Sequence, residues 1–184
     1  MTNASPADAS LDATSRSSDG AGDGRAITDA ARPLRVVALD EDDLTVVSAL
    51  VQDALTKPAE MRYIREPGAF ALTLNRLARE ERPRRRGPLG LRREWQRRRS
   101  LLEFRRVLRV RRRGFGPDRS EPVLSLLAVR FEPSSHDPAT ENDPSGTIVL
   151  EFAGNASLRL DVEVIETRLT DLGPAWASQA MPRH

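Results

Sequence analysis

The densest chemistry-bearing stretch of the sequence is RPRRRGPLGLRREWQRRR at residues 82–99, which holds nine arginines in eighteen positions. A guanidinium group binds phosphate through two parallel hydrogen bonds, and Trp95 offers a ring on which a base can stack. One hypothesis is therefore that RNA or DNA binds across residues 83–119. The side chains that would carry this binding are Arg84, Arg85, Arg86, Arg92, Arg93, Trp95, Arg97, Arg98, Arg99, Arg105, Arg109 and Arg111.

Two other interpretations of this stretch remain open. If the arginines met anionic lipid, Leu89, Leu91 and Trp95 would enter the headgroup layer. Alternatively, the stretch is a solvated loop with no specific ligand, as its helix-breaking residues Pro83, Gly87, Pro88 and Gly90 favour. Between residues 83 and 119, fifteen arginines face three acids, although the whole chain has a net charge of only +2. That asymmetry favours an anionic partner.

Acidic side chains are the second set of candidates. Glu151, Asp161 and Glu163 fall on outward positions of expected strands, and paired carboxylates act as general acid and base or hold Mg²⁺. An enzyme that uses these three residues is thus a further alternative, and it requires a concave pocket around them. Arg159 lies between them, however, and alternating charge is common on exposed strands. The acidic run at residues 40–43 is typical of a helix start rather than of a metal site.

Metal and nucleophile chemistry has little support. The chain has no cysteine and two histidines, His136 in a polar stretch and His184 at the last position. Without cysteine, a structural zinc site would need both histidines together with carboxylates, and a catalytic histidine needs a packed position and an orienting carboxylate. We therefore expect no catalytic residue, no metal and no cofactor. No signal peptide and no membrane-spanning stretch is recognised, so the expected location is the cytoplasm.

The elements that must position these side chains follow from periodicity. Residues 34–39 are a β-branched run typical of a strand. Residues 41–56 repeat apolar side chains at helical spacing after Asp40, which is a favourable N-cap. Residues 61–74 are expected to form a hairpin around a type II turn at Pro67-Gly68, which would set Tyr63 opposite Leu72.

The second half of the chain is expected to continue the sheet. Residues 100–113 alternate apolar and arginine side chains, and residues 122–132 are apolar on both faces, as in a central strand. Residues 147–162 indicate a hairpin whose three-residue loop sets Phe152 opposite Leu158. After it, Ile165, Leu169 and Leu172 recur on one face of an expected helix that Gly173 and Pro174 terminate.

These elements predict an α+β fold. It contains a mostly antiparallel, bent sheet or partial barrel of about six or seven strands, one helix after the first strand and a capping C-terminal helix. This order is compatible with a pleckstrin-homology-like topology. Residues 1–32 are expected to be disordered because they hold few large apolar side chains. A single domain would span residues 33–176, with an arginine-rich inserted loop at 82–100 and a polar loop at 132–146, before a flexible tail at 177–184.

Four segments of the sequence carry a resemblance to a known family. They are LRVVALDEDDLTVVSALVQDAL, FALTLNR, VLSLLAVRFEP and LRLDVEVIETRLTDLGPAW. With them the chain resembles uncharacterised bacterial proteins grouped as a domain of unknown function, DUF2948. The resemblance implies a small bacterial domain and brings no activity, cofactor or catalytic residue. It also implies that the arginine run is an insertion of variable length.

Three functional hypotheses follow. The first is a small cytoplasmic, non-enzymatic protein that binds an unidentified protein partner. It rests on the expected compact sheet of hairpins and on the absence of a recognisable catalytic constellation in the sequence. The second is nucleic-acid binding through residues 83–119. The third is an enzyme that uses surface carboxylates.

Overall fold

The computed structural model of the protein describes residues 33–81, 84–86, 92–116, 123–134 and 143–178. These residues form one α-helix, α1 (Glu41–Val51), one 3₁₀ helix, η1 (Pro58–Glu60), and twelve strands. The strands are β1 (Arg35–Ala38), β2 (Ala54–Thr56), β3 (Met61–Ile64), β4 (Ala69–Leu77), β5 (Arg84–Arg86), β6 (Arg92–Phe104), β7 (Val107–Arg113), β8 (Leu124–Pro133), β9 (Gly146–Phe152), β10 (Ala156–Val162), β11 (Thr167–Asp171) and β12 (Trp176–Ser178). The predicted disorder of residues 1–32 and most of the predicted tail at 177–184 lie outside the described residues.

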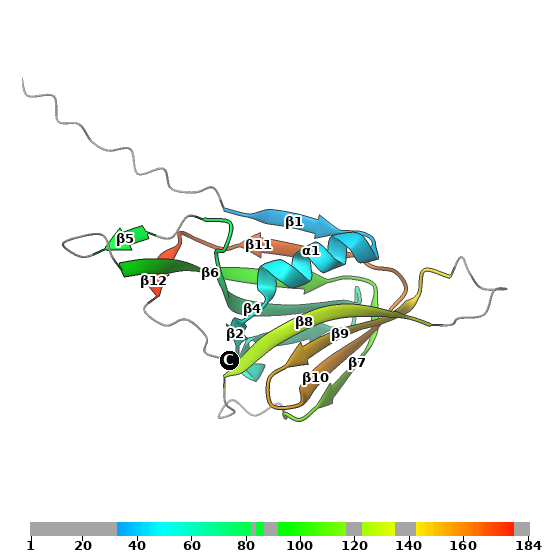
Figure 1. The fold of residues 1–184 in the computed structure, drawn as a ribbon. Helices are drawn as coiled ribbons and strands as arrows, with labels where there is room; N and C mark the ends of the chain where they lie inside the picture. The colour runs from blue at the N-terminus through cyan, green and yellow to red at the C-terminus, as the bar shows by residue number, and fades with distance from the viewer. Residues whose placement is uncertain (1–32, 82–83, 87–91, 117–122, 135–142, 179–184) are drawn as a thin grey trace, which may run out of the picture.

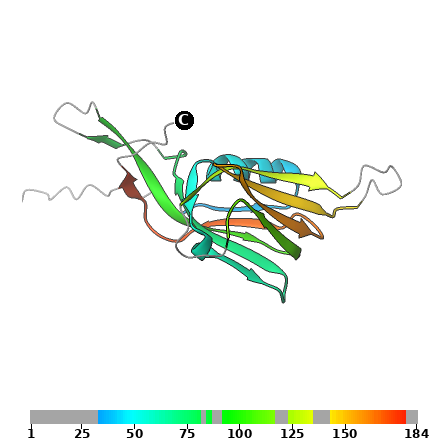
Figure 2. The same cartoon turned by 90° about the horizontal axis from the view of Figure 1, so that it is seen from below.

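The strands form one antiparallel sheet that bends strongly. Its main order is β1-β11-β6-β4-β2-β8-β9-β10-β7, while β3 pairs with β4, and β5 and β12 pair with β6. The half that contains β8, β9, β10 and β7 folds over the half that contains β1, β11, β6 and β4 (Figures 1 and 2). The helix α1 lies along the opening between the halves and packs against β8, β1 and β4 (Figure 1).

The hydrophobic core lies between the two halves of the sheet. Register sets Phe70 of β4 opposite Phe104 of β6, and the next row joins Leu72, Leu102 and Leu169. All five side chains are fully buried. The other half contributes Ile148, Leu150, Phe152, Leu158 and Leu160. Burial of each such side chain contributes about 1.5–3 kcal/mol, so the alternation along the strands determines which face of the sheet turns inward.

The prediction of an α+β fold with a capping C-terminal helix is wrong. The segment predicted as that helix contains the strand β11, and the described residues contain a single α-helix in a mostly antiparallel sheet of twelve strands. Thr167, Leu169 and Asp171 are buried and alternate with exposed or half-buried residues, which is the period of a strand. Leu172, which the helical interpretation placed in the core, is 52% exposed. Without the capping helix, the pleckstrin-homology-like topology loses its basis.

The first strand and the helix are confirmed. Asp40 is the N-cap of α1, and its carboxylate accepts a hydrogen bond of 2.8 Å from the backbone N–H of Asp43. The helix ends at Val51 and is therefore shorter than the predicted range of residues 41–56. Asp53 then adopts a left-handed φ of 61°, and the chain continues as β2, which pairs with β4 and β8.

Both predicted hairpins form, but each register is displaced by two residues. Tyr63 lies opposite Phe70 rather than Leu72, and Phe152 lies opposite Ala156 rather than Leu158. A displacement of two residues keeps every side chain on its predicted face. The apolar alternation therefore predicted the inner face correctly without fixing the length of the turn.

The predicted inserted loop at residues 82–100 contains strand structure, which corrects that prediction. The strand β6 begins at Arg92 and has 13 residues. Its later residues pair with β4, whereas its first residues pair with β5 and β12. We call β5, β12 and residues 92–97 of β6 the arm, because they extend beyond the bent sheet (Figure 2). The strand predicted over 100–113 is interrupted at Arg106, whose φ is 56°.

Candidate binding surface

All the predicted nucleic-acid residues except Arg105 fall into three groups, of which the first lies in the arm. Pairing of β5 with β6 sets Arg84 opposite Glu94, Arg85 opposite Arg93, and Arg86 opposite Arg92. Trp95 follows in β6 and is half-buried.

The second group lies at the base of the arm and is engaged by the protein itself. Arg98 is 3% exposed and donates from Nε to Glu81 at 2.6 Å and from Nη1 to the carbonyl of Gly173 at 3.1 Å. Arg97 is 8% exposed, and burial lowers its pKa. Arg99 donates to a glutamate of η1 at 2.9 Å. Arg97 and Arg98 are therefore buried within the fold, whereas Arg99 pairs with an acid on the surface.

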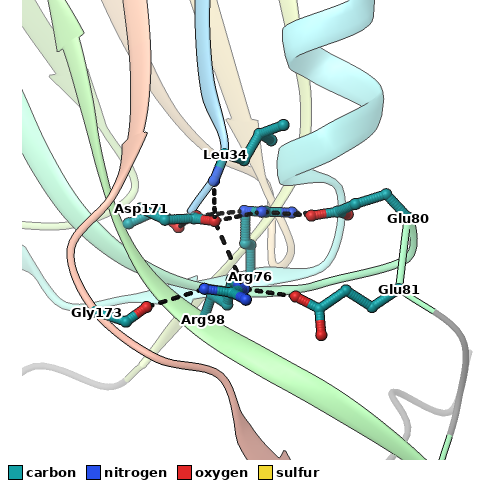
Figure 3. A network of polar contacts seen from close by, with 8 residues as sticks. Leu34, Arg76, Glu80, Glu81, Arg98, Asp171 and Gly173 are labelled. Atoms are coloured by element: carbon teal, nitrogen blue, oxygen red, sulfur yellow. Dashed lines mark hydrogen bonds and ion pairs between the residues drawn. The ribbon is translucent and has the colours of Figure 1, made fainter. Parts of the chain in front are cut away.

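Arg76 is fully buried and lies beside Arg98. At this end of the core, the inward positions of neighbouring strands change from apolar to polar side chains. Along β4 the inward series reaches Leu74 and then Arg76, which lies opposite Arg98 of β6. One row earlier, Ser100 of β6 lies opposite Asp171 of β11. Two guanidinium groups and a carboxylate thus meet at the end of the core nearest the arm (Figure 3).

The carboxylate of Asp171 is the centre of this buried network. Arg76 binds it through two hydrogen bonds, from Nε to Oδ1 at 3.0 Å and from Nη2 to Oδ2 at 2.9 Å. Ser100 donates to Oδ1 at 2.6 Å, and the backbone N–H of Leu34 donates to Oδ2 at 2.8 Å. Glu80 accepts from Nη1 and Nη2 of Arg76 at 3.0 and 2.6 Å (Figure 3). Each oxygen of the buried carboxylate therefore accepts two hydrogen bonds.

The network keeps its members charged. Burial alone would raise the pKa of Asp171, but hydrogen bonds from Arg76, Ser100 and Leu34 outweigh burial and hold this pKa below its ordinary value. Burial alone would lower the pKa of Arg76, and its bonds to Glu80 and Asp171 raise the pKa instead. The pKa of Glu80 is also lowered, because its bonds to Arg76 outweigh burial. Asp171, Arg76 and Glu80 therefore form a hydrogen-bonded ion cluster in which each bond favours the charged form of its partners.

The third group lies on β7, the last strand in the sheet order, whose second edge pairs with no strand among the described residues. Arg109, Arg111, Arg112 and Arg113 are all exposed. Arg111 forms an ion pair with Asp161, while the other three form none within the part of the chain that the structure describes. The register with β10 sets Arg112 on the face toward the core and the others on the outer face. We call these four arginines the basic edge.

The predicted carboxylate site does not assemble. Glu151 binds Arg130, and Asp161 binds Arg111. Glu163 lies 3.9 Å from Arg106 at the start of β7. Asp161 lies opposite Thr147 of β9, and Glu151 lies four residues further along the same strand. At the usual rise per residue, this separates the two acids by roughly 13 Å. Acids that share a proton or a metal ion lie closer together than this.

Sequence reasoning missed the buried network. The alternation of β4, with Leu72 and Leu74 inward, was the signal that could have placed Arg76 in the core, where an arginine requires an acidic partner. Asp171 was assigned to a helix, so its position beside Arg76 was hidden. Arg105, predicted with the nucleic-acid residues, belongs to none of the three groups and lies 3.9 Å from Glu166 at the corner between β6 and β7.

The fold and the surface together define a mostly antiparallel sheet protein with one charged strand edge. Among the described residues, no three His, Asp or Glu side chains gather as a metal site would require. Within the same residues, no helix has the length and hydrophobicity needed to cross a membrane. The chain belongs to the family described as Protein of unknown function (DUF2948), whose model matches residues 34–184. The resemblance noted in the sequence is thus confirmed, while no curated protein and no solved structure matches the chain.

Proposed function

We propose that the protein is a non-enzymatic interaction module that binds an acidic, extended segment of a partner protein along the basic edge. The observation that carries this proposal is the set of Arg109, Arg112 and Arg113, which are exposed on an unpaired strand edge without an acidic partner among the described residues. An extended peptide adds to such an edge through main-chain hydrogen bonds. Arginines on both faces of β7 match acidic side chains that alternate between the faces of the added strand.

The surroundings of β7 favour a peptide over a nucleic acid at this edge. The neighbouring strands carry Asp161, Glu151 and Glu132 on the same outer face, each in an ion pair with an arginine. The arginines without an ion pair among the described residues of this face therefore lie on β7 alone, which is a width that suits one added strand. Single-stranded nucleic acid also needs exposed rings for stacking. The ring of Phe115 packs against Phe152 instead, with centroids 5.8 Å apart.

Peptide binding measured by fluorescence anisotropy tests this proposal. The probe is a labelled peptide of alternating glutamate and valine, compared with the same peptide in which lysine replaces glutamate. We expect the acidic peptide to bind and its affinity to fall as salt screens the charges. The triple variant Arg109→Glu, Arg112→Glu and Arg113→Glu should weaken binding by about tenfold or more.

A matched triple variant controls for net charge. Arg35, Arg62 and Arg168 are exposed arginines on β1, β3 and β11, and changing all three to glutamate alters the total charge by the same amount. This control should bind the acidic peptide more tightly than the β7 variant does. Equal losses in the two variants would show that only overall charge matters and would overturn the proposal.

The arm supports nucleic-acid binding as a second candidate function. Its specific support is the register that sets Arg85 opposite Arg93 and Arg86 opposite Arg92. A labelled single-stranded oligonucleotide is the probe, and changing these four residues to glutamine should abolish its binding while leaving the acidic peptide bound. If the oligonucleotide binds and the acidic peptide does not, nucleic acid replaces the peptide as the partner class.

A further inference from the structure

A pocket lies at the end of β6 opposite the buried network, on the outer face of the sheet. It is a depression partly open to solvent, with a volume of about 350 Å³, and it is lined by Pro67, Ala69, Glu103, Arg105, Arg106 and Glu166. These residues come from the β3–β4 turn, the start of β4, the end of β6, the corner before β7 and the segment before β11. The pocket is separate from the basic edge, which begins further along β7.

Backbone hydrogen bonds fix the corner that carries the two arginines. The N–H of Arg105 donates to the carbonyl of Glu166 at 2.9 Å, and the N–H of Glu163 donates to the carbonyl of Arg106 at 3.0 Å. Arg106 has a left-handed φ of 56°, a conformation that costs a non-glycine residue energy and persists where neighbours hold it. Gly68 packs so closely that a Cβ there would lie 3.0 Å from the carbonyl oxygen of Val107. The backbone that carries the two arginines is thus held in place, while their side chains are 57% and 61% exposed.

The charged groups of the pocket are close to one another but not hydrogen-bonded. The side chain of Glu166 lies 3.9 Å from Arg105 and 3.7 Å from Arg106, beyond the usual range for a hydrogen bond. Glu103 is half-buried and forms no ion pair within the described residues. By contrast, the carboxylates that bind Arg76 lie at 2.6 to 3.0 Å. The pocket therefore offers both donors and acceptors to a ligand.

We propose that this pocket binds a small zwitterion, a free amino acid or a close analogue. The ligand carboxylate would accept hydrogen bonds from Arg105 and Arg106, as guanidinium groups readily provide, while its ammonium group would donate to Glu103. Pro67 and Ala69 supply the apolar surface for a side chain. The two glutamates disfavour a simple anion by repulsion, and the two arginines disfavour a simple cation, so a ligand with both charges is the one that satisfies all four groups.

Titrations of the full chain followed by backbone amide NMR test this inference. The probes are glycine and leucine as zwitterions, with acetate and methylammonium as ligands that carry one charge each. We expect leucine to shift the amide signals of Ala69 and Arg106 at concentrations about tenfold lower than acetate requires. Equal responses to leucine and acetate, or no response to either amino acid at tens of millimolar, would overturn the proposal.

Three variants assign the effect to the pocket. Arg106→Asn removes the guanidinium group and tolerates the left-handed backbone, and Glu103→Gln removes the negative charge. Each should weaken leucine binding by about tenfold, whereas Arg35→Gln on the distant β1 should leave it unchanged. Thermal melts that match the parent protein show that each variant is folded. Unchanged leucine binding in Arg106→Asn and Glu103→Gln would contradict the assignment.

Discussion

Arginine serves opposite purposes at the base of the arm and on β7. Arg76 and Arg98 are buried, and carboxylate and carbonyl oxygens meet their guanidinium groups at hydrogen-bonding distance. Arg109, Arg112 and Arg113 are exposed on a strand edge and have no acidic partner among the described residues. The first set is part of the folded interior, and the second is exposed to solvent. The number of arginines in a segment therefore does not measure how many of them can bind a partner.

The largest expected effect comes from breaking the buried set. Arg76→Met should lower the free energy of unfolding by about 3–5 kcal/mol, because it leaves Asp171 charged and buried without its main partner. On β7, Arg112→Met should change the same quantity by less than about 0.5 kcal/mol. Urea denaturation followed by circular dichroism measures both variants, and similar losses in the two would refute the contrast between the regions.

An intermediate effect is expected on acidification. Asp171 and Glu80 have a lower pKa in the folded protein than in the unfolded chain, so their contribution to stability is complete above the ordinary carboxyl pKa of about 4 and is lost as pH falls through the folded values. Urea midpoints measured from pH 7 downward should decrease in this range. The decrease should be shallower in Asp171→Asn, and an unchanged slope in that variant would show that the network does not supply the pH dependence.

The smallest effect sharpens the same comparison within one strand. Arg99 follows Arg98 in β6, but its side chain is 53% exposed and it binds Glu60 at 2.9 Å on the surface. Glu60→Gln should lower the free energy of unfolding by less than about 1 kcal/mol, since exposed ion pairs contribute little. Glu81→Gln, which removes the partner of buried Arg98, is the matched variant and should cost more. The reverse order would contradict burial as the deciding factor.

The alternation of apolar and polar side chains predicted much of the fold, but it did not decide between helix and strand in every segment. The inward positions Phe152, Leu158 and Leu160 are buried as expected, because a face of a strand is set by every second side chain. The helix start at Asp40 was equally clear, since capping is a local interaction. The error at residues 165–172 arose because Ile165, Leu169 and Leu172 also fit a helical period. Only pairing with β6 and β1, which is a long-range event, decides between the two.

The candidate surface was harder to predict because it depends on partners distant in the sequence. Arg98 and Arg109 are both arginines of the predicted set, and composition treats them alike. What separates them is that Glu81 accepts a hydrogen bond from Arg98, whereas Asp161, which lies opposite Arg109 in the register, pairs with Arg111 instead. Arg109 and Arg111 were predicted on an ordered, outward strand face and lie there, because that inference used alternation rather than charge count.

The ladder between β1 and β11 has a consequence for biosynthesis. Leu34 exchanges hydrogen bonds with Asp171, a residue 137 positions later, and Val36 lies opposite Leu169. During translation the amino-terminal strand leaves the ribosome among the first elements, yet the strand beside which it belongs is among the last to be made. Contacts of such high sequence separation slow folding, and β1 must wait with an unpaired edge until nearly the whole domain has emerged.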